Sequence, residues 1–305
     1  MPSEFEIIRR HFSRPAHHTL LGGGDDAALL APVPGMALAV STDLLLEGRH
    51  FAKGAEPRAL GHKSLAVNLS DMAAMGATPR WATLALALPA PDEDWLAAFA
   101  QGFYDLAGRF DVDLVGGDTT RGPLAVCVTI LGEVPEGLAL LRGGARPGDD
   151  IWVSGSLGGA AYALVEPGDA RAAQRLHTPE PRVALGERLR GLASAAIDVS
   201  DGFAQDLGHI LERSGVGALV HYERLPKFPV ADPELQQRCA LAGGDDYELA
   251  FTAPQSARAS IEPLAEALGV ALTRVGSIQP GEGRLQILDA GGDPLRLHAG
   301  FDHFA

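Results

Sequence analysis

Residues 114–122, LVGGDTTRG, decide how this chain folds. The apolar run that leads into this stretch ends in two glycines, and apolar residues bounded by glycine predict a buried strand. Gly116 and Gly117 carry no Cβ, so the backbone there can turn sharply and approach a ligand closely. An acid, two threonines and an arginine follow at once, beginning with Asp118. The stretch therefore predicts a carboxylate, hydroxyls and a guanidinium together at the end of a strand.

The same arrangement, an apolar run followed by acids or hydroxyls, recurs along the chain. The residues concerned are Asp25, Asp26, Ser41, Thr42, Asp43, Asp71, Asp198, Asp201, Asp245, Asp246 and Glu248. If these points meet in space, two carboxylates about 4 Å apart repel by about 1 kcal/mol in water and about 4 kcal/mol at the effective dielectric of a protein. Cations must balance that charge. Carboxylate and hydroxyl oxygens suit hard ions such as Mg²⁺, which also bind phosphates.

The composition is that of a globular protein. The chain has 305 residues, of which 46% are hydrophobic and 21% charged, and this length allows two domains. The Gly- and Pro-rich segment 135–150 predicts the boundary, which gives an N-terminal domain of residues 1–137 and a C-terminal domain of residues 138–305. We expect an α/β fold in both, each domain a mixed β-sheet covered by helices.

Charge and hydropathy disfavour several classes of protein. A net charge of −14 without a basic tract disfavours nonspecific nucleic-acid binding. The N-terminus lacks the apolar segment of a signal peptide. No apolar run approaches the ~20 residues that span a bilayer, so we expect a cytoplasmic protein. Cys127 and Cys239 stand alone, which indicates small buried residues rather than a disulfide or zinc site.

Periodicity predicts the elements that carry these residues. In the first half we expect helices at 1–12, 58–75 and 93–109 and strands at 37–43, 81–88, 112–115 and 124–131. In the second half we expect strands at 151–153, before Asp198, after Glu248, and at 272–278 and 283–287, with helices at 180–193, after Asp201 and at 257–268. The glycine-rich turn 154–159 matches no phosphate-binding pattern, so we attribute its glycines to tight packing.

Two groups of polar residues allow alternative interpretations. Ser64, Asn68 and Asp71 recur at helical spacing on an otherwise apolar helix. A solvent-facing stripe normally carries long charged side chains, so we favour a polar site that faces inward. Ser200 and Asp201 could be helix N-caps, although capping explains only one of them.

Three further residues are each open to two interpretations. Tyr104 lies off the apolar stripe of its helix and is either a surface residue or a ligand contact. Arg142 is either a solvated charge of the linker or a ligand for phosphate. Phe301 either covers the core or stacks on a planar ligand.

Eight motifs occur in one order along nearly the whole chain: GGGDDAALL, VSTDLLLEGRHF, AVNLSDMAAMGATP, VGGDTTRGP, RGGARPGD, AIDVSDGFAQDLGHI, AGGDDYELAFT and GFDHF. Together they closely resemble the bacterial thiamine-monophosphate kinases, a family in the superfamily of aminoimidazole ribonucleotide synthetase and selenophosphate synthetase. The resemblance implies ATP-dependent phosphorylation of thiamine monophosphate to thiamine diphosphate, with several Mg²⁺ ions. It also implies a homodimer joined through the N-terminal domains and a C-terminal domain that completes the active site.

The resemblance also assigns roles to residues. It implies metal ligands at Asp26, Ser41, Thr42, Asp43, Asp71, Asp118, Asp198 and Asp201, with Asp43, Asp71 and Asp118 as the catalytic acids. It implies ATP contacts at Gly117, Asp118, Arg142 and Ser200, and we add Tyr104 as a candidate. It implies substrate contacts at His50 and Phe301 and at one acid of the segment 245–248.

One departure from the family pattern matters. The family usually has GGEDYE where this chain has GGDDYE, so either Asp245 or Glu248 is the expected contact. Rival interpretations are a sibling enzyme that activates an amide or a selenide, and a non-catalytic nucleotide- or metal-binding module. The selenide enzyme uses a reactive Cys near its N-terminus, whereas the first Cys here is Cys127. Retention of every acidic cluster together with Arg142 argues against the non-catalytic module.

Overall fold

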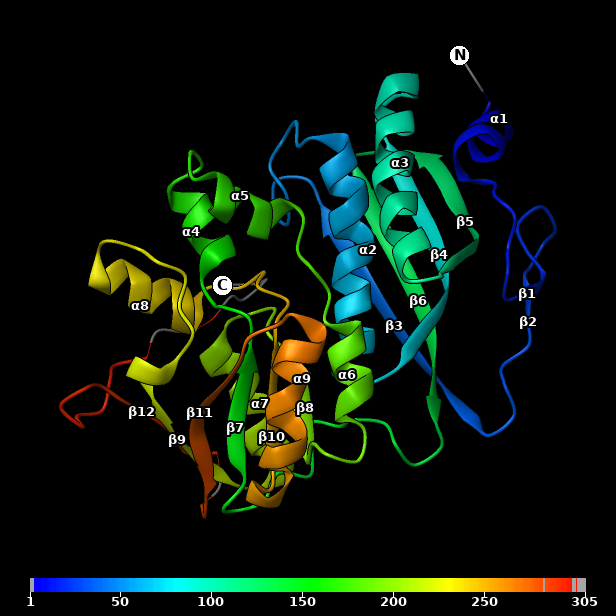
Figure 1. The fold of residues 1–305 in the computed structure, drawn as a ribbon. Helices are drawn as coiled ribbons and strands as arrows, with labels where there is room; N and C mark the ends of the chain where they lie inside the picture. Colours follow the sequence, from blue (N-terminus) through cyan, green and yellow to red (C-terminus); the bar gives the residue numbers. More distant parts are fainter. Residues whose placement is uncertain (1–2, 282, 298–299, 301–305) are drawn as a thin grey trace. The chain divides into compact units, whose positions relative to one another are not determined.

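The computed structural model describes residues 3–281, 283–297 and 300 of the chain. The chain divides into two compact units (Figure 1). The first consists of Met1–Met72 and Ala77–Gly137, and the second of Ala73–Gly76 and Leu138–Ala305. None of the helices in the described part of the chain is both long and apolar enough to cross a lipid bilayer.

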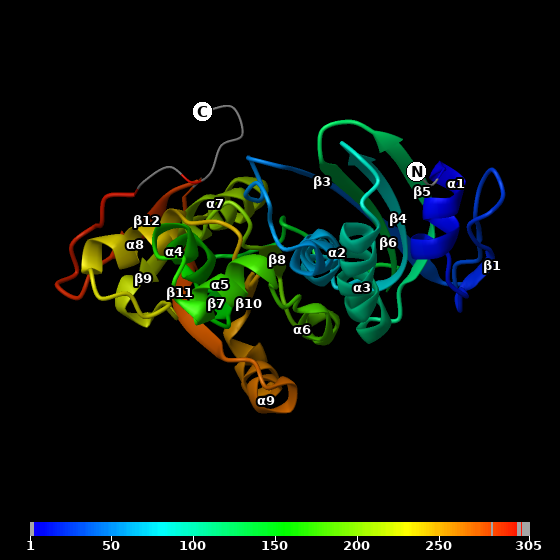
Figure 2. The same ribbon diagram turned by 90° about the horizontal axis from the view of Figure 1, so that it is seen from above.

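The first unit is a four-stranded sheet with two long helices on one face (Figures 1 and 2). Its elements are α1 (Glu4–Ile7), η1 (Ile8–Phe12), β1 (Thr19–Leu21), β2 (Leu29–Leu30), β3 (Met36–Leu46), α2 (Pro57–Ala74), β4 (Thr78–Leu88), α3 (Glu93–Arg109), β5 (Asp113–Arg121) and β6 (Ala125–Pro135). The strand order is β3-β6-β4-β5, with β4 and β5 parallel and the other pairs antiparallel. The sheet therefore has β3 and β5 at its edges, while α2 and α3 cover one face.

Two glycines allow α2 and α3 to pack closely. A Cβ on Gly61 of α2 would lie 2.0 Å from the carbonyl oxygen of Phe99, and a Cβ on Gly102 of α3 would lie 1.9 Å from that of Arg58. No side chain fits at such distances, so the two helix backbones meet at these glycines. This contact brings the apolar faces of both helices onto the sheet, where Phe99 and Phe103 are fully buried.

The second unit is a six-stranded sheet with helices on both faces, for instance α7 on one and α9 on the other (Figures 1 and 2). Its elements are β7 (Asp150–Ser154), α4 (Gly159–Val165), α5 (Ala170–His177), α6 (Val183–Leu189), β8 (Ala195–Asp198), α7 (Phe203–Ser214), β9 (Gly217–His221), η2 (Tyr222–Arg224), α8 (Pro233–Ala242), β10 (Leu249–Ala253), η3 (Gln255–Ala257), α9 (Arg258–Leu268), β11 (Leu272–Gln279) and β12 (Leu285–Leu288). The order is β12-β9-β11-β7-β10-β8, and within the described strands of this sheet only the pair β12–β9 is parallel. Apolar residues of β7, β8 and α7 form its core.

The prediction that strands end at the acids of the first unit is wrong. β3 continues three residues beyond Asp43 to Leu46, and β5 continues through Asp118 to Arg121. The reason is cross-strand pairing, since the ladder between β3 and β6 runs on to Leu46 opposite Ala125. A strand tolerates polar residues when alternate side chains face solvent. The site residues therefore lie within strands, and their direction depends on the face they occupy.

The second unit also differs from the prediction between residues 154 and 193. The expected helix 180–193 is shorter, Val183–Leu189, and two short helices, α4 and α5, precede it. The start of α5 had a recognisable signal, because Asp169 accepts hydrogen bonds from the backbone N–H groups of Arg171 and Ala172. Helices of seven or eight residues present too few turns for periodicity to detect.

Replacing Gly102 by alanine tests the close packing of α2 and α3. We expect Gly102→Ala to lower the free energy of unfolding by about 1–3 kcal/mol, because overpacking forces the two backbones apart. Urea unfolding followed by circular dichroism measures the change. Gly108→Ala, on the same helix, is the control, since no atom lies within 4 Å of a Cβ there. Alanine is the better helix former by about 1 kcal/mol, so this variant should be at least as stable as the wild type. Equal midpoints for the two variants would contradict the close approach.

Candidate functional site

Ser41 and Asp71 form the most direct contact among the predicted site residues. Ser41 lies on β3 and Asp71 on α2, and the Ser41 hydroxyl donates a hydrogen bond of 2.5 Å to Asp71 Oδ2. Asp43 follows Ser41 by two positions in the strand, so its side chain projects from the same face. This face of β3 is the one that α2 covers, whereas the side chains of Thr42 and Leu44 face away and are exposed.

The polar stripe of α2 faces inward, as predicted. Ser64 and Asn68 are buried, and the Asn68 amide donates to the carbonyl oxygen of Ser64. Asn68 Oδ1 is buried and has no hydrogen-bond partner among the described residues. It lies one helical turn before Asp71 on the same stripe. An unpaired buried carbonyl oxygen is costly, and a cation or its water shell would satisfy it.

Asp26 and Asp118 line one pocket at the β5 edge of the sheet. This pocket has a volume of about 630 Å³, within the range of about 300–1,000 Å³ typical of small-molecule sites. Gly117 and Thr119 of β5 also line it, as does Asp25. The pocket thus combines the glycine-rich loop 22–26 with residues of the stretch 114–122.

The two groups of acids lie on opposite faces of the sheet. Across the strands, Asp43 is in register with Val128, Leu84 and Gly117, so Asp118 is in the neighbouring row with Ala85, Cys127 and Leu44. Neighbouring residues of a strand point to opposite faces. Consistent with this, no group of three or more His, Cys, Asp or Glu side chains is gathered at metal-binding spacing in the part of the chain that is described.

Acids of β5 and β6 hold both ends of the N-terminal arm, residues 17–33, which carries the glycine-rich loop 22–26. Asp113 accepts hydrogen bonds from the backbone N–H groups of His17 and His18 and from the Thr19 hydroxyl, at 2.7–2.9 Å. Burial would raise the pKa of Asp113, but these donors hold it below its ordinary value. At the other end of the arm, Glu133 accepts from the N–H of Val33 at 2.6 Å.

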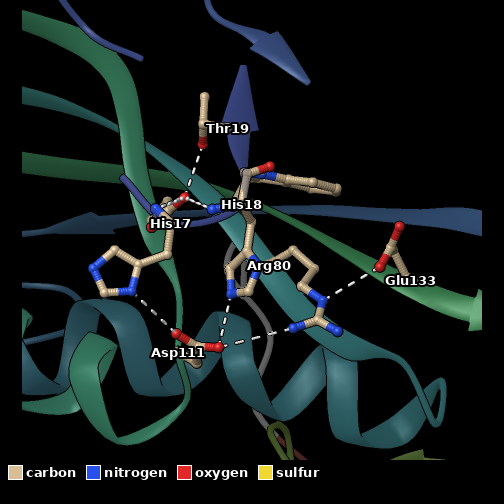
Figure 3. A network of polar contacts seen from close by, with 8 residues as sticks. His17, His18, Thr19, Arg80, Asp111 and Glu133 are labelled. Atoms are coloured by element: carbon tan, nitrogen blue, oxygen red, sulfur yellow. Dashed lines mark hydrogen bonds and ion pairs between the residues drawn. The ribbon is translucent and has the colours of Figure 1, made fainter. Parts of the chain in front are cut away.

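Figure 3 shows the side chains that join this network. His18 Nε2 lies 2.7 Å from Asp111 Oδ2, and Arg80 lies between Asp111 and Glu133, with its Nε 3.3 Å from Glu133. The non-glycine residue Asp111 has a φ of +54°, a conformation that strongly prefers glycine or a short polar side chain. The arm that carries the loop 22–26 is therefore hydrogen-bonded to β5 and β6 at its two ends, whereas Asp25 and Asp26 in the loop are exposed.

Three further predicted residues of the first unit, Thr42, His50 and Tyr104, each make a hydrogen bond within that unit. Thr42 Oγ1 lies 2.8 Å from Thr129 Oγ1 on the exposed face. His50 Nδ1 accepts a hydrogen bond from the N–H of Leu46, and the Tyr104 hydroxyl donates to the carbonyl oxygen of Phe12. Tyr104 is thus half-buried rather than a free surface residue, and burial raises its pKa to about 12.

In the second unit, a buried carboxylate holds the acidic turn after β8. Asp206 Oδ2 accepts hydrogen bonds from the backbone N–H groups of Ser200, Asp201 and Gly202 at 3.0–3.1 Å. Burial and then the charge of Asp198 raise the pKa of Asp206 to about 7, against the effect of these donors. The N-cap interpretation of Ser200 and Asp201 is wrong, because the N-cap residue of α7 (Phe203–Ser214) is Gly202, which makes no side-chain cap. Asp206, which the sequence analysis missed, orients this turn.

Glu248 is a buried anchor in the segment 245–248. It is fully buried, and Arg182 binds it through two hydrogen bonds of 2.6 and 2.7 Å. Arg175 and the Ser154 hydroxyl donate to the same carboxylate at 3.0 and 2.6 Å. Burial alone would lower the pKa of Arg182, but Glu248 raises it, so the guanidinium stays charged. A Cβ at Gly155 would lie 1.9 Å from Glu248 Oε1, so tight packing accounts for this glycine of the turn, as predicted.

The neighbouring acids of this segment point in different directions. Asp246 is buried and accepts a hydrogen bond from the N–H of Gly158 at 2.7 Å, and burial raises its pKa well above the ordinary value. Asp245 is only half-buried, and the Tyr247 hydroxyl donates to it at 2.8 Å. Both Asp245 and Tyr247 have positive φ, at +65° and +51°. Such backbone strain persists where the surrounding contacts enforce it, and here the anchors Asp246 and Glu248 do so.

The linker arginine and the terminal aromatic residue complete the set. Arg142 is exposed, and its carbonyl oxygen accepts a hydrogen bond from the Ser214 hydroxyl at 3.2 Å. Phe301 lies outside the described residues. The predicted metal ligands are carboxylates and hydroxyls, and Asn68 Oδ1 adds an unpaired amide oxygen. This all-oxygen donor set fits Mg²⁺ better than a soft or borderline metal.

Comparison with known proteins finds relatives along the whole chain. The family model AIR synthase related protein, N-terminal domain, matches residues 24–134, and the model of the C-terminal domain matches residues 146–287. Thiamine-monophosphate kinase of Escherichia coli (strain K12) is 45% identical over 321 residues, covering 99% of this chain and 98% of the relative. That of Bacillus subtilis (strain 168) is 34% identical and covers 99% of each.

Solved structures agree. The crystal structure of thiamine-monophosphate kinase from Stenotrophomonas maltophilia K279a is similar with a TM-score of 0.86 and 46% identity, covering 95% of each chain. A structure described as AaThiL complexed with AMPPCP and TMP has a TM-score of 0.78 and 28% identity, covering 90% of this chain and 89% of that one.

Removing the charge of Glu248 tests its role as an anchor. Glu248→Gln removes the buried carboxylate that Arg175 and Arg182 both bind, so we expect the free energy of unfolding to fall by about 3–5 kcal/mol. Urea unfolding measures it. Asp105→Asn is the control, because Asp105 pairs with Arg58 at the surface, where such pairs contribute below about 1 kcal/mol. A loss for Glu248→Gln no greater than that of the control would contradict the anchoring role.

Proposed function

The chain belongs to the AIR synthase-related family and within it to the thiamine-monophosphate kinases, and from this premise we propose that it transfers the γ-phosphate of ATP to thiamine monophosphate, giving thiamine diphosphate. Full-length similarity at 45% identity carries this proposal, because it covers both units and every motif. AMPPCP, an ATP analogue, and TMP in the related complex are consistent with the two substrates. We place the reaction in the cytoplasm, where ATP is available to biosynthetic enzymes.

The proposed chemistry is a direct in-line transfer. An oxygen of the substrate phosphate attacks the γ-phosphorus of ATP, a new P–O bond forms, and the bond to the β-phosphate oxygen breaks to release ADP. The attacking group needs no strong base, because the second pKa of a phosphate monoester is about 6. The protein must instead align two anions and balance their charge. A carboxylate-lined site that holds cations suits this task.

The proposed Mg²⁺ ligands are the oxygen donors described above. In the first unit they are Asp26, Ser41, Thr42, Asp43, Asp71 and Asp118, and in the second unit they are Asp198 and Asp201. When bound, Mg²⁺ neutralises the phosphate oxygens and polarises the phosphorus for attack. The Ser41–Asp71 contact and the unpaired Asn68 oxygen on the same stripe support a cation on this side of the sheet. The buried Asp206 holds the turn that presents Asp201.

The proposed nucleotide and substrate contacts follow the family resemblance. For ATP they are Gly117, Asp118 and Tyr104 in the first unit and Arg142 and Ser200 in the second. The pocket lined by Gly117 and Asp118 supports the first of these assignments. For thiamine monophosphate we propose His50, Phe301 and Asp245. We choose Asp245 over Glu248 because both oxygens of Glu248 are already engaged in buried hydrogen bonds.

We also propose a homodimer formed through β3. The outward face of this edge strand carries apolar side chains that are 39–60% exposed: Leu38, Val40, Leu44 and Leu46. A row of exposed apolar residues on an edge strand favours association or aggregation unless it is covered. Asp118 lies on this same face of the sheet, so a second copy packed there would cover the face on which this acid lies.

An acid in the proposed Mg²⁺ site should be essential for turnover. We expect Asp71→Asn to lower kcat by about 100-fold or more, because a preorganised charge that stabilises the transition state is lost. Incubation with Mg-ATP and thiamine monophosphate, with thiamine diphosphate and ADP quantified by chromatography, measures it. Asp94→Asn, at an exposed position at the start of α3, is the control. Absence of product with the wild-type protein would refute the kinase proposal. Normal turnover in Asp71→Asn would refute the role of Asp71.

A charge placed on the outward face of β3 should separate the dimer. We expect the wild type to have twice the monomer mass of 31.9 kDa in light scattering coupled to size exclusion, and Val40→Glu to be monomeric at the same concentration. Burying a carboxylate in an apolar interface is unfavourable. Leu164→Glu, at a 70% exposed position of the second unit, should stay dimeric. A monomeric wild type, or a Val40→Glu dimer of unchanged strength, would rule out this interface.

A further inference from the structure

The segment 244–248 lies directly against the acidic turn that follows β8. The N–H of Asp245 donates a hydrogen bond of 2.9 Å to the carbonyl oxygen of Ser200. The N–H of Tyr247 donates one of the same length to the carbonyl oxygen of Val199. These two bonds join the backbones of the segment and the turn, so the side chain of Asp245 starts from a fixed place beside that turn.

Tyr247 also holds the carboxylate of Asp245. Its hydroxyl donates a hydrogen bond of 2.8 Å to Asp245 Oδ1, and its ring is buried, with 8% of the residue exposed. Both residues have positive φ, a backbone conformation that costs free energy outside glycine and persists only where contacts enforce it. The group that orients the carboxylate is therefore itself fixed by packing, which is what an accurate binding site requires.

Asp245 is the acid of this segment that a ligand can reach. It is half-buried, whereas Asp246 and Glu248 are buried. Glu248 binds Arg175 and Arg182, so its charge is balanced inside the protein. Burial raises the pKa of Asp246 well above the ordinary value, which disfavours its negative charge. The accessible carboxylate of the segment is therefore that of Asp245.

We propose that the Asp245 carboxylate, positioned by the Tyr247 hydroxyl, recognises the positively charged thiazolium ring of thiamine monophosphate. The inference rests on the proposed function, since it takes thiamine monophosphate as the substrate. It goes further by assigning one chemical feature of that substrate, the charge of its ring, to this acid, and by making Tyr247 a positioning residue that determines specificity.

The substrate carries two opposite charges, and these suit different surroundings. Its phosphate is an anion, which a carboxylate repels unless a cation lies between them. Its thiazolium ring is a cation, which a half-buried carboxylate attracts more strongly than an exposed one because water screens the pair less. The pyrimidine ring is neutral and offers a carboxylate only a hydrogen bond. The ring charge is therefore the feature for which an acid at position 245 is most selective.

The contact between the segment and the turn also fits the length of the substrate. A short ethyl linker joins the thiazolium ring to the phosphate, so the two charged groups bind at neighbouring places. Asp245 lies beside the turn that presents Asp201, a proposed Mg²⁺ ligand. A ring held at Asp245 directs the phosphate toward that turn, where the proposed metal ligands of the second unit lie.

Equilibrium binding of two probes isolates the ring charge. One probe is thiamine monophosphate, and the other is its thiophene isostere, in which carbon replaces the ring nitrogen and the ring is neutral. Both are titrated calorimetrically into the full chain with excess Mg²⁺ and no nucleotide. We expect the wild type to bind thiamine monophosphate about 10-fold more tightly than the isostere. Asp245→Asn should bind the two equally, because asparagine keeps the shape, tolerates the positive φ and lacks the charge.

Tyr247→Phe keeps the ring and removes only the hydroxyl. We expect it to weaken binding of thiamine monophosphate by about 3- to 10-fold, in line with the net loss of one hydrogen bond, and to leave binding of the isostere unchanged. In the Asp245→Asn background the same change should not alter the preference further, because Tyr247 acts through the charge of Asp245. In turnover it should raise KM for thiamine monophosphate, with kcat and KM for ATP unchanged.

Tyr222→Phe is the matched control. The Tyr222 hydroxyl is buried in the same unit and has no hydrogen-bond partner among the described residues. Its removal should therefore leave both affinities and both KM values at the wild-type level. A variant that merely loosens the fold would weaken binding of both probes equally and lower the unfolding midpoint.

The possible outcomes keep this inference separate from the kinase proposal. If the wild type and the variants bind the probes as expected but the wild type forms no thiamine diphosphate, the kinase proposal fails and the recognition of the ring charge stands. If the wild type is an active kinase but binds both probes equally, the inference is refuted. It is also refuted if Tyr247→Phe binds both probes as the wild type does, if either variant weakens both probes to the same extent, or if the wild type does not bind thiamine monophosphate.

Discussion

Buried carboxylates that accept hydrogen bonds from loops are the constraint on which both units depend. Asp113 binds the N–H groups at the start of the N-terminal arm, and Asp206 binds three consecutive N–H groups after β8. Glu248 binds two arginines and a hydroxyl. A buried ionised carboxylate without such partners costs several kcal/mol. Each loop is therefore held in the one conformation that satisfies its acid.

This constraint has a consequence for the proposed function, because the anchored loops also carry acids of the proposed site. The turn held by Asp206 presents Asp201, and the segment anchored by Asp246 and Glu248 presents Asp245 in a strained backbone conformation. One set of acids is neutralised by the protein itself. In the proposed function, cations balance the charge of the other set, as the transfer of a phosphoryl group between two anions requires.

The sheet of the first unit imposes a second constraint, since neighbouring residues of a strand face opposite sides. Asp71 and Ser41 meet on the side covered by α2, while Asp118 lies on the other side with the exposed apolar row of β3. The glycine-rich loop reaches this second side from the N-terminal arm, whose ends Asp113 and Glu133 hold. The N-terminal elements close the same pocket with aromatic groups. Asp118 and the exposed apolar row of β3 thus lie on one face of the sheet, although β5 and β3 are its opposite edges.

The sequence by itself determined the elements with strong periodicity. Its ordered motifs also indicated the family and the chemistry of that family. The helix predicted at 93–109 is α3 with the same bounds, and the inward polar stripe of α2 follows from its lack of long charged residues. Family membership was also readable, because a set of ordered motifs is specific even when each one is short. Periodicity and motifs can be recognised in the sequence because both depend on residues that are neighbours in the chain.

Only the tertiary structure decided what each acid does. Asp245, Asp246 and Glu248 are chemically alike and close in sequence, yet one is half-buried beside Tyr247 and two are buried anchors. The extension of β3 past Asp43 depends on its pairing with β6, because Leu44 pairs with Cys127 and Leu46 with Ala125, residues that are far apart in the sequence. Arg175 and Arg182, the partners of Glu248, are likewise brought to it by packing. Burial and hydrogen-bond partners come from residues distant in sequence, and a local pattern contains no information about them.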